Sequence, residues 1–113
     1  LSFKGRSKYM IKSGGENIYP AEIEKLLLKD PRIAEVSVVK RADSKWGEIP
    51  VAFVARNDEG LVADDIFTLC KNNIASYKCP RQVYFILENE FPRNSMGKIE
   101  KTVLEQKLET ASL

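Results

Sequence analysis

The feature that most limits the fold of this chain is the segment PVAFVAR at residues 50–56, which is apolar from Pro50 to Ala55. A strand with one face in solvent alternates apolar and polar residues, whereas this segment is apolar on both faces. We therefore expect it to be the central strand of its sheet. With 113 residues, the chain fits a single domain with one modest core.

Two further strands and a hairpin are predicted around this segment. Residues 34–40, AEVSVVK, alternate and place Val36 and Val38 on one face. Residues 82–88, QVYFILE, form a third strand. Near the N-terminus, SGGEN indicates a tight Gly-Gly turn within a β-hairpin region that covers residues 1–19.

Three amphipathic helices complete the predicted α+β domain. The first begins at Pro20, where the missing N–H costs little, and the others cover residues 62–74 and about 98–109. Their inward positions are expected to be Val62, Ile66, Leu69, Ile99, Val103, Leu104 and Leu108. The prediction is therefore a hairpin followed by a small three-stranded sheet with flanking helices. This domain spans 20–109, and a disordered tail follows at 110–113.

Composition excludes several classes of protein. The net charge of +2 is too small to indicate a nucleic-acid binder, and no apolar run approaches the roughly 20 residues that cross a bilayer. No signal peptide is visible, and Cys70 and Cys79 show no metal or disulfide spacing, which favours a reducing cytoplasm. The chain lacks an initiating methionine, so we expect it to be part of a longer protein.

The sequence also contains no histidine, which removes the commonest general base and the commonest metal ligand. Any chemistry must therefore rely on lysine, arginine, carboxylates or backbone groups. No metal site is expected in this chain.

The segment FPRNSMGKIEK, residues 91–101, places one lysine at the end of a polar loop before the last helix. A phosphate-binding GxxxxGK[ST] loop would need Gly at position 92 and Ser or Thr at 99, but the chain has Pro92 and Ile99. Pro92 fixes the entry to the loop, Gly97 frees its exit, and Lys98 can carry an ammonium into a neighbouring site. Taken alone, the spacing favours a surface lysine that caps a turn.

A second motif, GRSKYMIKSGGENIYPAEIE, covers residues 5–24. Arg6 follows a glycine and suits a phosphate or a ribose edge, and Gly14 with Gly15 would let a ligand approach the backbone closely. Taken alone, this motif also fits a tight hairpin with solvated charges.

Together the two motifs resemble one family. The pattern GR-x-[DK]-x-x-I-K-x-x-G-x-x-I-x-P-x-E-I-E appears at residues 5–24, and P-[RK]-x-x-x-G-K appears at 92–98. With these motifs in this order and at this separation, residues 5–108 resemble the small C-terminal domain of acyl-CoA synthetases. These enzymes belong to the adenylate-forming superfamily, with peptide-synthetase adenylation domains and luciferases.

The resemblance implies the mobile lid of an AMP-forming ligase. Such enzymes join a carboxylic acid, fatty or aromatic, to ATP, which gives an acyl-adenylate and pyrophosphate. They then pass the acyl group to the thiol of CoA, and the small domain rotates between the two steps. ATP with its Mg²⁺ and the acid are expected to bind to an N-terminal domain that is absent from this chain, so the isolated chain is expected to be inactive.

The same resemblance assigns roles to individual residues. Lys98 matches the adenylation lysine, whose charge would stabilise the bond that forms between carboxylate and α-phosphate. Arg6 matches an arginine that contacts the nucleotide, and Lys8 matches the hinge position. Gly14 and Gly15 match hairpin glycines that line the pantetheine channel. A lysine acetyltransferase is a further expected partner, because acetylation of Lys98 would remove its charge.

A site for the nucleotide of CoA is implied less directly. In some relatives, aromatics that match Trp46 and Tyr77 stack on the adenine, and Lys78 or Arg81 would meet the 3′-phosphate. Cys79 stands where some relatives have a second basic residue, which weakens that contact. The alternative is that Trp46 packs on the edge of its own sheet.

Two rival functions stay open. A sister ligase would load the phosphopantetheine of a carrier protein instead of free CoA. Trp46 and residues 16–24, ENIYPAEIE, favour a CoA ligase only weakly. A stand-alone nucleic-acid-binding module is supported only by the basic residues at positions 4, 6, 8 and 12. Acidic residues are spread too evenly along the chain to favour that module, and no nucleic-acid partner is expected.

Overall fold

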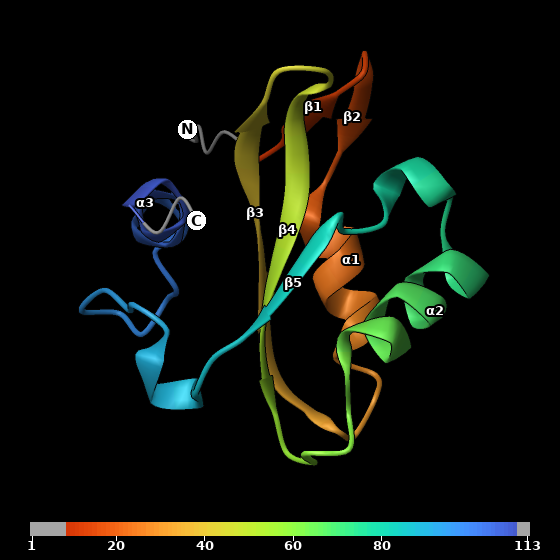
Figure 1. Ribbon diagram of the computed structural model, residues 1–113. Coiled ribbons are helices and arrows are strands. Elements are labelled where there is room, and N and C mark those ends of the chain that lie inside the picture. The colour runs from red at the N-terminus through yellow and green to blue at the C-terminus, as the bar shows by residue number, and fades with distance from the viewer. Residues whose placement is uncertain (1–8, 111–113) are drawn as a thin grey trace, which may run out of the picture.

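The computed structural model describes residues 9–110. Arg6 and Lys8, which were predicted to contact the nucleotide and to form the hinge, lie outside the described residues. The elements, drawn in Figure 1, are β1 (Ile11–Ser13), β2 (Glu16–Ile18), α1 (Pro20–Leu27), β3 (Ile33–Asp43), β4 (Gly47–Arg56), α2 (Ala63–Asn73), β5 (Gln82–Phe85) and α3 (Lys101–Thr110). Two 3-10 turns, η1 (Ser76–Lys78) and η2 (Glu88–Glu90), flank β5.

Strand β4 forms the centre of a five-stranded sheet. It pairs along its whole length with antiparallel β3, and residues 51–54 also pair with parallel β5. The hairpin of β1 and β2 joins the same sheet where Ser13 lies opposite Gly47. All β4 residues from 49 to 55 are buried, so the central strand predicted from PVAFVAR is confirmed.

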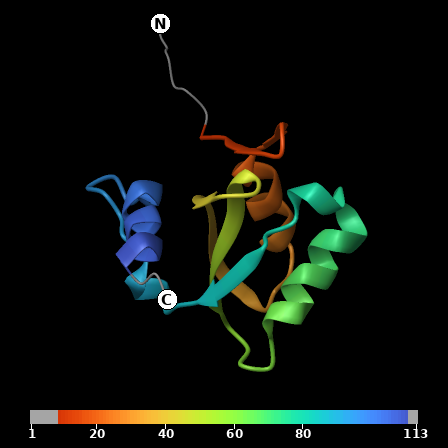
Figure 2. The same cartoon turned by 45° about the horizontal axis from the view of Figure 1, so that its top comes forward.

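The helices cover opposite faces of the sheet. Helices α1 and α2 lie on one face and α3 lies on the other, as Figures 1 and 2 both show. Ile23 and Ile66 enter the first core, and Leu104 and Leu108 enter the second. Each of these four side chains is at most 5% exposed, and burial of such a side chain contributes about 1.5–3 kcal/mol.

The small α+β fold predicted from the sequence is confirmed. Pro20 opens α1 at its first turn as expected. Gly14 and Gly15 have φ angles of +57° and +86°. Positive φ at both central residues is what a two-residue type I′ hairpin turn requires. No helix within residues 9–110 is long and apolar enough to cross a membrane.

Two details of the predicted helices are wrong. Val62, expected to face inward, is 48% exposed because it is the extended residue before α2 and not part of the helix. The last helix begins at Lys101 and not near Lys98, because the residues before it close a separate turn. Helix α3 reaches Thr110, the first residue of the predicted disordered tail, and residues 111–113 lie outside the described part.

Candidate functional site

Lys98 stands at the end of a hydrogen-bonded turn. The Gly97 N–H donates to the Asn94 carbonyl at 2.9 Å, and the Asn94 N–H donates to the Lys98 carbonyl at 2.9 Å. The side chain of Asn94 also accepts from the N–H groups of Met96 and Lys98, at 2.8 and 3.1 Å. Gly97 has a φ of +83°, which favours glycine at this position. The loop is therefore a closed turn with its own cap.

Contacts from outside the turn hold it against the domain. Arg93 donates to the Gly97 carbonyl at 3.0 Å and pairs with Glu35 of β3 at 3.1 Å. Lys98 is exposed, and its ammonium forms no ion pair or hydrogen bond within residues 9–110. An uncompensated ammonium on a fixed turn can approach an anion without first breaking another contact.

A second group of predicted residues gathers where the hairpin meets the β3–β4 loop. We call this region the hairpin edge and define it by Gly14, Gly15, Trp46 and Arg81. The Gly14 N–H donates to the Trp46 carbonyl at 2.9 Å. A Cβ atom added to Gly14 would lie 2.7 Å from a ring carbon of Trp46, so only glycine fits there. The Arg81 guanidinium carbon lies 4.8 Å from the centroid of the Trp46 ring, a cation–π contact.

The other two residues predicted to hold CoA lie in η1. Tyr77 is 40% exposed, and Lys78 pairs with Glu22 of α1 at 3.1 Å. The hydrogen bond with Glu22 raises the pKa of Lys78 above its ordinary value. The Lys78 ammonium is therefore engaged by a carboxylate, whereas Arg81 and Lys45 both lie against the Trp46 ring, at 4.8 and 5.4 Å from its centroid.

The Lys98 turn and the hairpin edge are separate regions. In Figure 1 the segment that precedes α3 lies at the left of the sheet, whereas the β1–β2 hairpin and η1 lie at the upper right. The fold thus brings Gly14, Trp46 and Arg81 together and keeps Lys98 apart from them.

Sequence reasoning missed a set of polar residues at the outer edge of β3. Tyr9, Glu24, Lys101 and Glu105 come from three segments and are joined by hydrogen bonds. The sequence pattern offered no signal for them, because their contacts span 14 to 96 positions along the chain. Asn94 was missed too, although an Asn three residues before a Gly is a recognisable turn signal.

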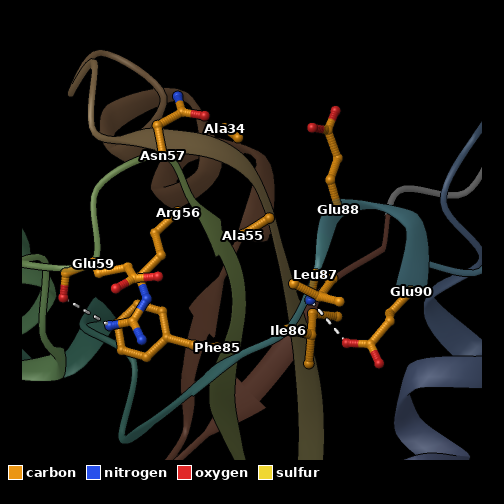
Figure 3. Close-up of a pocket in the computed structure, with 10 residues that line it drawn as sticks. All are labelled: Ala34, Ala55, Arg56, Asn57, Glu59, Phe85, Ile86, Leu87, Glu88 and Glu90. Carbon is orange, nitrogen blue, oxygen red and sulfur yellow. Dashed lines mark hydrogen bonds between the residues drawn. The ribbon is translucent and has the colours of Figure 1, made fainter.

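A cavity of about 300 Å³ lies at the other end of the sheet, where β4 and β5 end. Figure 3 shows that it contains none of the predicted site residues. Arg56 stacks on Phe85 at 4.4 Å and donates to the Leu61 carbonyl at 2.6 Å, so its charge is already engaged. Within the described residues, no group of three or more His, Cys, Asp or Glu side chains could hold a metal ion.

Comparisons with known proteins agree with this architecture. An indoleacetate–CoA ligase of Aromatoleum aromaticum is 50% identical over 90% of this chain, and a long-chain-fatty-acid–CoA ligase of Mycobacterium tuberculosis is 44% identical over 94%. The chain spans about a fifth of the length of these curated relatives, 20% and 21%.

Solved structures give the same result. A fatty acyl CoA synthetase of M. tuberculosis superposes with a TM-score of 0.84 at 42% identity, over 91% of this chain and 20% of that one. The apo MatB protein of Rhodopseudomonas palustris superposes with a TM-score of 0.85 at 32% identity, over 96% of this chain and 22% of that one. The profile of the AMP-binding enzyme C-terminal domain matches residues 22–98. The chain therefore belongs to the AMP-binding enzyme C-terminal domain family.

Proposed function

We propose that this domain is the mobile lid of an AMP-forming acyl-CoA ligase. The reaction joins a carboxylic acid to ATP, releases pyrophosphate, and passes the acyl group from the acyl-adenylate to CoA. One observation carries the proposal: Lys98 presents an ammonium that has no ion pair or hydrogen bond within residues 9–110, on a capped turn in a region separate from the hairpin edge. Two separate surfaces suit a domain that serves two successive steps.

In the first step, Lys98 approaches the substrate carboxylate and the α-phosphate. Negative charge gathers there as the carboxylate oxygen attacks phosphorus and pyrophosphate leaves, and a positioned ammonium stabilises that transition state. Arg6 would contact the nucleotide and Lys8 would form the hinge. ATP with its Mg²⁺ and the acid would bind to an N-terminal domain of the longer enzyme, so the isolated chain is expected to release no pyrophosphate.

In the second step, the hairpin edge faces the active site. Gly14 and Gly15 would line the channel for the pantetheine arm. Gly15 leaves open space beside the backbone, and Gly14 lets the Trp46 ring pack directly against the turn. Trp46 offers its exposed ring to the adenine of CoA, and Arg81 would contact the 3′-phosphate. Tyr77 would add stacking surface, whereas Lys78 would first have to leave Glu22. CoA is proposed as acceptor instead of a carrier protein because the similar proteins are named CoA ligases.

The charge of Lys98 also offers a point of control. Acetylation by a lysine acetyltransferase would remove the positive charge and stop the first step. The exposed position of Lys98 on its turn makes the amine accessible to such an enzyme. Two free cysteines, Cys70 and Cys79, suit the reducing cytoplasm that we propose as its location.

The test is single-turnover formation of acyl-adenylate by the full-length enzyme that carries Lys98→Ala. We expect a loss of at least about 100-fold, in the range found when one transition-state donor is removed. Lys107→Ala is the matched control, because Lys107 is another exposed lysine that forms no ion pair among residues 9–110. Equal rates for the two variants would contradict the proposal.

A further inference from the structure

Strand β3 lies at the outside of the sheet and pairs only with β4 in the described part of the chain. The backbone groups on its outer edge therefore need other partners. The Val38 N–H donates to Glu24 at 2.8 Å, and the Val38 carbonyl accepts from Lys101 at 2.9 Å. The Lys40 N–H donates to the Tyr9 hydroxyl at 2.9 Å. Side chains from α1, α3 and the N-terminal segment thus replace the missing strand.

Tyr9 is the member of this set nearest to the proposed hinge. Its hydroxyl accepts from the Lys40 N–H and donates to the carboxylate of Glu105 on α3. Its ring is half-buried and contacts both apolar cores. Burial, followed by the hydrogen bond to Glu105, raises the pKa of Tyr9 far above its ordinary value, so the hydroxyl keeps its proton.

Lys101 fixes the start of α3 to the same edge. Its ammonium forms an ion pair with Glu24 and donates to the Ser37 hydroxyl at 3.1 Å, in addition to the Val38 carbonyl. The ammonium also lies 5.3 Å from the centre of the Tyr9 ring. Helix α3 is therefore attached to β3 at two successive turns, directly through Lys101 and by way of Tyr9 through Glu105.

We propose that Tyr9, held by Glu105 and Lys40, is a positioning residue that sets where Lys98 stands relative to the hinge. The inference rests on the proposed function, because it takes the residue before Tyr9 as the pivot. Lys98 lies three residues before Lys101, so the helix that receives the Tyr9 hydrogen bond also carries the end of the Lys98 turn. The contacts link Tyr9 through α3 to the turn that carries Lys98, and Tyr9 follows the proposed hinge residue directly in the sequence.

This link does not include the hairpin edge. Gly14 and Trp46 are held by contacts of β1 with the β3–β4 loop, and none of those contacts involves α3. Loosening of Tyr9 should therefore displace Lys98 more than the surface that serves thioester formation. Displacement of a catalytic group by about 1 Å can cost as much as 100-fold in rate.

The experiment measures both half-reactions of the full-length enzyme with Tyr9→Phe. We expect adenylate formation to fall at least about tenfold, while thioester formation from supplied acyl-adenylate and CoA stays within about twofold. Glu105→Gln keeps an acceptor for the hydroxyl and should give an intermediate loss. Tyr84→Phe is the matched control, since it removes only the 3.3 Å hydrogen bond that the Tyr84 hydroxyl accepts from Arg41 on the same face of the sheet. It should leave both rates unchanged.

A double variant separates positioning from simple loss of stability. In a Lys98→Ala background there is no ammonium to position, so adding Tyr9→Phe should not lower adenylate formation further. A tenfold additional loss in that background, or an equal loss of both half-reactions in Tyr9→Phe alone, would overturn the inference. So would unchanged rates in Tyr9→Phe. If Lys98→Ala itself has no effect, the proposed function fails instead.

Discussion

The Lys98 turn and the hairpin edge differ in how the chain builds them. The turn closes through hydrogen bonds among residues 94–98, and the Arg93–Glu35 ion pair links it to β3. The hairpin edge is assembled from segments about 30 residues apart, which meet at the Gly14–Trp46 and Trp46–Arg81 contacts. A short hydrogen-bonded turn is therefore enough to hold the Lys98 charge in place. The hairpin edge, in contrast, depends on contacts between segments that are distant in the sequence.

The two regions also differ in how their cations are used. Lys98 has no counterion within residues 9–110, whereas Lys78 is paired with Glu22 and Arg81 lies against Trp46. The free charge suits a group that must act on an anion in a transition state. The contacts of Lys78 and Arg81 instead hold those side chains in fixed positions, which suits a rigid binding surface.

The largest effect is expected from a methyl group added at the hairpin edge. Gly14→Ala places a side chain at a φ of +57° and against the Trp46 ring, which should cost about 2–5 kcal/mol of unfolding free energy from strain and overpacking together. Gly15→Ala is the matched variant, because its φ is +86° but no atom lies within 4 Å of the added carbon. It should cost only about 1–2 kcal/mol. Urea unfolding of both variants measures the difference, and equal costs would show that the contact with Trp46 is not tight.

A smaller effect is expected from the cap of the Lys98 turn. Asn94→Ala removes the acceptor for the N–H groups of Met96 and Lys98, which should cost about 1 kcal/mol. Adenylate formation by the full-length enzyme should fall several-fold because the turn loosens, and thioester formation should not change. Ser95→Ala, in the same turn, is the control. A loss confined to thioester formation would reverse the assignment of the two regions.

The smallest effect is expected at the Glu22–Lys78 pair. The pKa of Lys78 is raised in the folded chain, so the pair stabilises the fold below the ordinary value of 10.5 and loses that effect as pH rises through the raised pKa. Glu22→Gln should therefore lower the unfolding temperature slightly at pH 7, and the difference should shrink at high pH and in high salt. A difference that is insensitive to both conditions would mean that the contact is not ionic.

Much of the fold was predictable because its signals are local. The apolar run of β4, the proline at the start of α1 and the Gly-Gly turn each act over a few residues, and each prediction is confirmed. The join between hairpin and sheet was not predictable, because the pairing of Ser13 with Gly47 depends on tertiary packing. Val62 was misplaced because apolar periodicity does not distinguish the last residue of an extended segment from the first turn of a helix.

The candidate site shows the same limit. The motif around Lys98 indicated a lysine at the end of a loop, and the structure places it exposed on a capped turn. The pairing of Lys78 with Glu22 could not be predicted from the sequence, because it depends on Glu22 of α1 lying beside η1. The hydrogen bond from Tyr9 to Glu105 joins residues 96 positions apart, and no sequence pattern in either segment predicts it.

The most direct test of the division between the two regions is to supply acyl-adenylate and CoA to the full-length enzyme with Lys98→Ala. If Lys98 serves only the first step, thioester should form at the rate of the unaltered enzyme, although the same variant barely makes acyl-adenylate from ATP. Loss of thioester formation to the same degree would show that Lys98 acts in both steps, and the assignment of separate tasks to the two regions would be wrong.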